Sequence, residues 1–138
     1  MAAEIEEIQY GAPTELRFKS TAIAVAAATD TTIATFEVPA GATHLFFEVK
    51  NTGGGAAFDT FIITRRAHPD GDWETIADAA GDFTTPQSPI IEASGSPVTL
   101  ADGVDEFVRM EVEGMRTIRL QASGNAATTT AEVYAFIR

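Results

Sequence analysis

The sequence predicts an all-β protein, an antiparallel β-sandwich of jelly-roll or immunoglobulin-like type with about eight strands. Apolar and polar residues alternate with a period of two in many short segments. Turns containing glycine, proline or aspartate separate most of these segments at intervals of about 8–12 residues, which is typical of sandwiches and barrels. Helical periodicity is almost absent, and this argues against a parallel sheet built from βαβ units.

The first half of the chain contains the clearest strand patterns. Alternation of apolar and charged residues predicts a strand from Leu16 onward, which residues 21–28 either extend or follow. Further strands are expected at residues 32–38, 44–50 and 58–66. In the first of these, the even-numbered side chains are expected to share one face.

The second half is less regular. Residues 68–72 form a hairpin turn, and residues 77–97 are expected to be a long connection holding one short strand. At most a turn or two of helix is expected, at residues 2–8 and 77–80. The remaining strands are expected at residues 73–76, 98–100 (a brief pairing), 108–112, 118–122 and 131–137.

The 138 residues fit one domain. We expect a single β-sandwich domain over residues 14–138. Residues 1–13 are acidic and end in Gly11-Ala12-Pro13, which predicts a flexible N-terminal arm. Terminal arms that are not tied down often become ordered only on assembly.

The charge of the chain excludes several classes of partner. The formal net charge is −11, and only nine residues are lysine or arginine. Nucleic-acid binding normally depends on such cations, so we expect no nucleic-acid partner. Residues 22–28, the most apolar run, are far fewer than the roughly 20 residues that span a bilayer, and no signal-peptide pattern is present. We therefore expect no membrane partner and synthesis in a cytoplasm.

The residues that could carry chemistry are few. There is no cysteine, and His44 and His68 are the only histidines, so neither a zinc site nor a nucleophile–base pair is indicated. Asp70 and Asp72 are weak candidates for calcium ligands because calcium prefers oxygen donors. Turn chemistry explains both aspartates better. We expect a non-enzymatic protein with no cofactor.

Aromatic and arginine residues on nominally polar strand faces are the candidate interface residues. Phe46 and Phe107 project from the polar side of their strands, and Arg109 shares the face of Phe107. Aromatics in such positions indicate a second buried surface, either the other sheet or a subunit contact. The candidate interface residues also include Arg65, which belongs to a pair of arginines, and Trp73, which follows the predicted hairpin turn.

Several segments carry a resemblance to a known class of protein. They are TIATFEVPAG (32–41), LFFEVKNTG (45–53), FDTF (58–61), HPDGDW (68–73) and IRLQAS (118–123). Across these segments the chain resembles small β-sandwich virion proteins of tailed bacteriophages, most of all capsid decoration (cement) proteins. The resemblance implies attachment to the outer capsid at symmetry axes, often as a trimer, and reinforcement of the shell. No single binding residue transfers with it.

The functional expectation is therefore a structural protein of a phage virion, made in the host cytoplasm. It would bind a capsid or other virion protein and form a homo-oligomer, with a trimer favoured. Two alternatives remain open. One is a tail or head-tail component. The other is a β-sandwich module that binds carbohydrate or a host surface, in which Trp73 and the aspartates of residues 70–72 would be the working residues.

Overall fold

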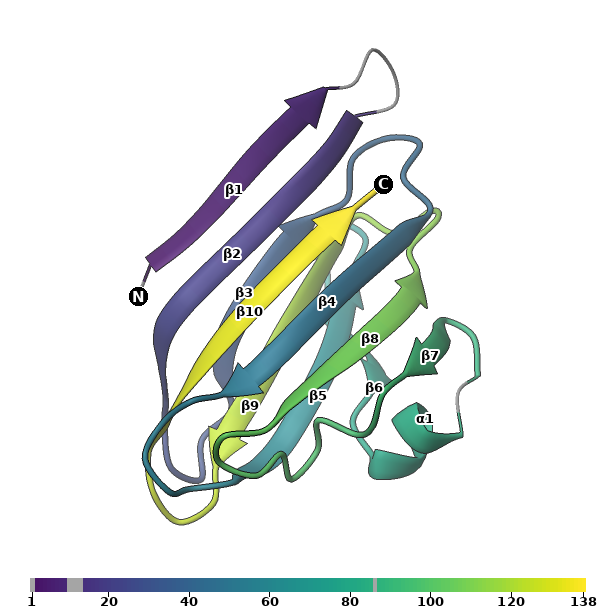
Figure 1. Cartoon of the computed structure of the whole chain (residues 1–138). Helices are drawn as coiled ribbons and strands as arrows, with labels where there is room; N and C mark the ends of the chain where they lie inside the picture. The colour runs from purple at the N-terminus through teal and green to yellow at the C-terminus, as the bar shows by residue number, and fades with distance from the viewer. Residues whose placement is uncertain (1, 10–13, 86) are drawn as a thin grey trace.

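The computed structural model describes residues 2–9, 14–85 and 87–138, and shows an all-β sandwich of two antiparallel sheets (Figure 1). The six-stranded sheet has the order β1-β2-β10-β4-β8-β7, and the four-stranded sheet has the order β3-β9-β5-β6. The strands are β1 (Ala2–Gln9), β2 (Thr14–Val25), β3 (Thr31–Glu37), β4 (His44–Asn51), β5 (Phe58–Arg66), β6 (Glu74–Ala77), β7 (Ile90–Ala93), β8 (Asp105–Glu111), β9 (Thr117–Gly124) and β10 (Thr129–Ile137).

The strand pairs are nested, and this makes the sandwich a jelly roll. β5 and β6 form the innermost pair, β4 pairs with β8, β3 with β9, and β2 with β10, all antiparallel. Consecutive pairs alternate between the two sheets, so an antiparallel ribbon wraps around the core. Of the two sandwich types that the sequence left open, the jelly roll is the observed one. The two additional strands, β1 and β7, lie at the edges of the six-stranded sheet.

Along each strand buried side chains alternate with exposed ones, and the buried side chains fill the space between the two sheets. Phe47 from β4 and Phe61 from β5 face each other across the core, with ring centroids 6.1 Å apart. The long connection after β6 contributes Phe83, which is buried from the helix α1 (Ala80–Thr84) and contacts Phe61 edge-on at 6.0 Å. The connection is therefore part of the core. In the part of the chain that the structure describes, no helix is long and apolar enough to cross a membrane.

Three local expectations differ from the structure. Ile33 and Ala34 are both buried, because a bulge in β3 between Thr32 and Ala34 shifts the register. Residues 98–100 form a turn and no strand. The helical turn lies at residues 80–84, a few residues later than expected.

The N-terminal segment also pairs with the sheet. Its residues 2–9, where a turn of helix was expected, form strand β1 in antiparallel register with β2. The sheet therefore extends beyond the predicted domain start at residue 14. The rest of the predicted arm, residues 1 and 10–13, lies outside the described residues, and its flexibility stays a prediction.

A buried amide holds together the loops at one end of the sandwich. Asn51 ends β4 and is only 1% exposed. Its Nδ2 donates hydrogen bonds to the carbonyls of Ala56 (2.8 Å) and Leu100 (3.0 Å), and its Oδ1 accepts one from Thr129 Oγ1 at 2.6 Å. Because three segments far apart in sequence meet at one side chain, Asn51 fixes their relative positions.

The residues after Asn51 need a glycine for steric reasons. A Cβ atom at Gly53 would lie 2.2 Å from the backbone nitrogen of Thr130. The chain passes so close to β10 because the Thr52 nitrogen donates to the Thr130 carbonyl at 2.8 Å. The Asn-Thr-Gly sequence thus encodes a hydrogen-bonding side chain followed by a close backbone approach.

Replacing Asn51 by alanine is expected to lower the free energy of unfolding by about 2–4 kcal/mol, because the Ala56 carbonyl and the Thr129 hydroxyl would lose this hydrogen-bond partner, whereas the Leu100 carbonyl would keep the Phe58 nitrogen as a donor. Urea unfolding followed by tryptophan fluorescence measures this. The matched control is Asn125→Ala, an amide that is exposed in the neighbouring turn, and it should change the stability by less than about 0.5 kcal/mol. Equal effects of the two substitutions would contradict the role of Asn51.

Candidate functional site: an aromatic groove

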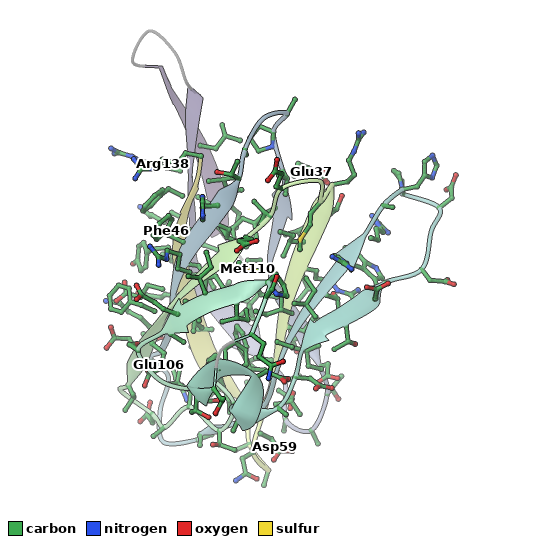
Figure 2. All side chains as sticks on the ribbon, turned by 90° about the vertical axis from the view of Figure 1, so that its right-hand side faces the viewer. Glu37, Phe46, Asp59, Glu106, Met110 and Arg138 are labelled. Atoms are coloured by element: carbon green, nitrogen blue, oxygen red, sulfur yellow. The ribbon has the colours of Figure 1, made fainter. Side chains whose placement is uncertain are left out.

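A groove of about 650 Å³ lies on the outer face of the six-stranded sheet. Figure 2 shows Phe46 and Arg138 on this outer side, away from the second sheet, whereas Met110 lies between the sheets. Strands β2, β10, β4, β8 and β7 all contribute to the groove. Its lining residues are Arg17, Phe18, Lys19, Phe46, Phe47, Glu48, Glu92, Phe107, Val108, Arg109, Tyr134, Ala135 and Phe136.

One row of directly opposed residues crosses five strands of the sheet. Arg17 on β2 is paired with Phe136, Phe136 with Phe46, Phe46 with Arg109, and Arg109 is aligned with Glu92 on β7. Because opposed residues in an antiparallel sheet project from the same face, the row places two phenylalanines between two arginines. The pairing of the strands therefore builds the site.

The aromatic rings of the groove are in mutual contact. Phe46 and Phe136 stack with their centroids 4.6 Å apart and their planes 13° from parallel. The next row pairs Tyr134 with Glu48 and Glu48 with Phe107. Phe107 is 55% exposed, an unusually high value for so large an apolar side chain. The groove thus offers apolar area to a partner.

Cations surround these rings. The guanidinium of Arg109 lies 5.9 Å from the Phe46 centroid and that of Arg138 lies 5.7 Å from Phe136. These separations are within the range of cation–π attraction. Arg109 also approaches Glu92, with 4.0 Å between Nε and Oε1. Aromatic area and charged side chains of both signs therefore occur together in the groove.

A group of acidic residues lies beside the aromatic rings. The pKa of Glu48 is raised, first by desolvation and then by a hydrogen bond to the Asp105 side chain and by nearby carboxylates, whereas Lys50 acts in the opposite direction. Tyr134 Oη donates a hydrogen bond to Glu132 Oε2 at 3.0 Å, and this bond is the main reason why the pKa of Tyr134 is raised.

Of the five predicted interface residues, three come together and two do not. Phe46, Phe107 and Arg109 share the outer face of the six-stranded sheet, as described above. Arg65 lies on β5 of the other sheet, and Trp73 lies in the loop just before β6. Arg65 donates twice to Glu74 Oε1, from Nε at 3.1 Å and from Nη2 at 2.7 Å. This exposed pair adds less than about 1 kcal/mol to stability.

Trp73 is occupied by contacts within the chain. The guanidinium carbons of Arg66 and Arg119 lie 4.4 and 4.1 Å from its ring centroid. Arg119 Nε also donates to Thr64 Oγ1 at 3.2 Å. Burial, and secondarily the neighbouring charge of Arg66, lowers the pKa of Arg119. We therefore interpret Trp73 as an anchor for two arginines of the four-stranded sheet.

The weak metal candidates are not gathered into a site. Asp70 and Asp72 are both exposed in the loop between β5 and β6, and the Asp70 carboxylate lies 3.8 Å from His68 Nδ1. Further along, Asp82 accepts hydrogen bonds from the backbone nitrogens of Asp78 and Ala79, each at 3.0 Å, which lowers its pKa. Among the described residues, no group of three or more His, Cys, Asp or Glu side chains is arranged to hold a metal ion.

Sequence reasoning missed three residues of the row that crosses the sheet, Arg17, Phe136 and Glu92. Phe136 follows the same signal as Phe46, an aromatic on the face opposite to the buried residues of its strand, and the signal was present in the alternation of residues 131–137. Arg17 had no comparable signal. Its position beside Phe136 depends on the pairing of the first and last core strands.

Comparisons with protein-family models, curated proteins and solved structures gave no match for this chain. The functional argument therefore depends on the groove and its residues.

The change Asp105→Asn is expected to lower the pKa of Glu48 toward its usual value, because it removes a neighbouring carboxylate. A ¹³C NMR titration of the side-chain carboxyls measures this, with Asp59→Asn, an exposed aspartate of the other sheet, as the control. A carboxyl with a raised pKa stabilises the fold at acid pH, and this contribution is lost as the pH rises through its folded pKa. An unchanged Glu48 titration in Asp105→Asn would contradict the assignment.

Proposed function

We propose that this chain is a non-enzymatic structural subunit of a larger protein assembly, and that the aromatic groove of the six-stranded sheet is its assembly contact. Within that class we propose a bacteriophage virion as the assembly and capsid decoration as the role. A tail or head-tail location is the alternative that the same groove would serve.

The observation that carries the proposal is the grouping of aromatic rings and arginines on an open sheet face. Aromatic residues and arginine are enriched in protein interfaces, and residues such as these provide most of the binding energy. Phe107 at 55% exposure is left without cover in the isolated chain. A contact with another protein would bury it.

The chemistry of the groove also favours contact over catalysis. Among the described residues that line it there is no serine, threonine, cysteine or histidine. A serine, threonine or cysteine nucleophile beside a histidine base therefore has no place there. The raised pKa of Glu48 follows from burial and neighbouring carboxylates, as in many structural clusters.

The alternative of a carbohydrate-binding module has less support from the geometry. Sugars stack on an open aromatic face, whereas Phe46 and Phe136 cover each other. Trp73, which the alternative would use, is packed against Arg66 and Arg119. The jelly-roll fold does not distinguish a virion protein from a carbohydrate-binding module, since viral capsid domains and lectins both have this fold.

The test is cosedimentation with expanded, DNA-free capsid shells of a tailed bacteriophage and, separately, with purified tails. We expect the native chain and the control Val104→Asp to pellet with shells, and Phe107→Asp to remain in the supernatant. Val104 is the matched control because it is also an exposed apolar residue, at 40%, and lies outside the groove.

Two results would count against the proposal. Pelleting of Phe107→Asp as efficiently as the native chain would exclude the groove as the contact. Pelleting of the native chain with tails alone would replace decoration by the tail alternative, and failure to pellet with either would overturn the virion role.

A further inference from the structure

We infer that Arg66 and Arg119, which both contact Trp73, form a binding site for a carboxylate group. The ligand is the carboxylate of an acidic protein side chain or of a small carboxylic acid. The site lies on the outward side of the four-stranded sheet. It is separate from the aromatic groove and goes beyond the proposed assembly contact.

Strand register places the two arginines on the same side of the sheet. Arg66 on β5 is directly opposite Thr117 on β9, and Arg119 is opposite Thr64. Residues two apart in a strand project from the same side, so Arg66 and Arg119 are diagonal neighbours. Ile118, between Thr117 and Arg119, is buried in the core, which identifies the arginine side as the outward one. Both arginines are partly exposed there.

Trp73 fixes the positions of both guanidinium groups. Their central carbons lie 4.4 Å (Arg66) and 4.1 Å (Arg119) from the centroid of the tryptophan ring, within the range of cation–π attraction. Arg119 Nε also donates to Thr64 Oγ1 at 3.2 Å. A guanidinium that stacks on an aromatic ring keeps the N–H groups along its edge for hydrogen bonds. Trp73 therefore holds two groups of donors in place without neutralising their charge.

Neither guanidinium is neutralised by a carboxylate in the part of the chain that the structure describes. Arg65 and Arg109 have ion-pair partners there, whereas Arg66 and Arg119 have none. The Nε atom of Arg66 is also buried without a hydrogen-bond acceptor among those residues. Burial, and then the charge of Arg66, lowers the pKa of Arg119, as expected for two desolvated cations that repel each other. An anion at their N–H edges relieves this repulsion.

The surrounding charges determine which anion fits. The strands of this sheet and the turns at residues 67–73 and 112–116 carry six carboxylates and two further arginines. They are Glu37, Asp59, Asp70, Asp72, Glu74, Glu113, Arg65 and Arg116. An anion with several charges, such as phosphate or nucleic acid, is repelled by these carboxylates. A single carboxylate carries one charge and accepts paired hydrogen bonds from a guanidinium, so it is the ligand that suits this pair.

The main test uses the indole N–H of Trp73, which is the only tryptophan and therefore gives a unique ¹H–¹⁵N NMR signal. The native chain is titrated with sodium acetate and, separately, with sodium phosphate and sodium chloride at the same ionic strength. We expect acetate to shift the indole signal to saturation in the millimolar range. Phosphate should shift it less at equal concentration, and chloride should leave it unchanged.

Substitutions of the two arginines locate the site. Arg66→Gln and Arg119→Gln should each raise the dissociation constant for acetate by about tenfold or more, because each removes charge-assisted hydrogen-bond donors. The matched control is Arg65→Gln, which removes the same charge from a neighbouring residue that already pairs with Glu74. It should change the dissociation constant by less than about twofold. The amide spectrum shows whether each variant folds, and Arg119→Lys, which keeps the charge but loses the paired N–H edge, should also weaken binding.

The source of the carboxylate is tested with a short peptide that contains one glutamate and is acetylated and amidated at its ends. The glutamate side chain is then its only carboxylate. Tighter binding of this peptide than of acetate would identify a protein side chain as the source. Binding of acetate without binding of the peptide would identify a small carboxylic acid.

Three results would overturn the site. The first is an indole signal that neither acetate nor the peptide shifts. The second is an unchanged dissociation constant in both Arg66→Gln and Arg119→Gln. The third is saturation by phosphate at a lower concentration than by acetate, which would exclude a carboxylate as the preferred ligand. Because these measurements use no capsid shells or tails, they can fail while the proposed function stands.

Discussion

The structure depends on the insertion of β10 between β2 and β4. This last strand completes the six-stranded sheet through antiparallel pairing on both of its edges. Its inward residues, among them Val133, close the core, and its outward Phe136 is placed between Arg17 and Phe46. Core and groove therefore come from opposite faces of one strand, because successive side chains in a strand alternate. Loss of this pairing would remove both.

The strands of the jelly roll were largely predictable because each has one buried face and therefore a period of two. Residues 58–66 and 131–137 show how closely pattern and structure agree. The bulge that buries Ile33 beside Ala34 was not predictable, since one extra residue changes the face without changing the composition. Strand β1 was not predicted either. It is an edge strand paired only with β2, and such a strand shows a weaker alternation of apolar and polar residues than a central strand.

The groove was predictable only in part. Phe46, Phe107 and Arg109 were identified because each occupies an outward position in a regular strand. That they lie beside Arg17 and Phe136 depends on strand order, which no local pattern contains. The same limit explains why Trp73 was grouped with them although it packs against arginines of the other sheet.

The nested pairing has a consequence for synthesis. Since β2 and β10 are neighbours in the sheet but are separated by seven other strands in the sequence, the six-stranded sheet cannot close until β10 has been synthesised. Of the four nested pairs, the hairpin of β5 and β6 is the one whose two strands follow each other directly in the sequence. Contacts between such distant segments slow folding. Until β10 has been synthesised, the inner faces of the earlier strands of this sheet are incompletely covered, and the many acidic residues of the chain help to keep it from aggregating.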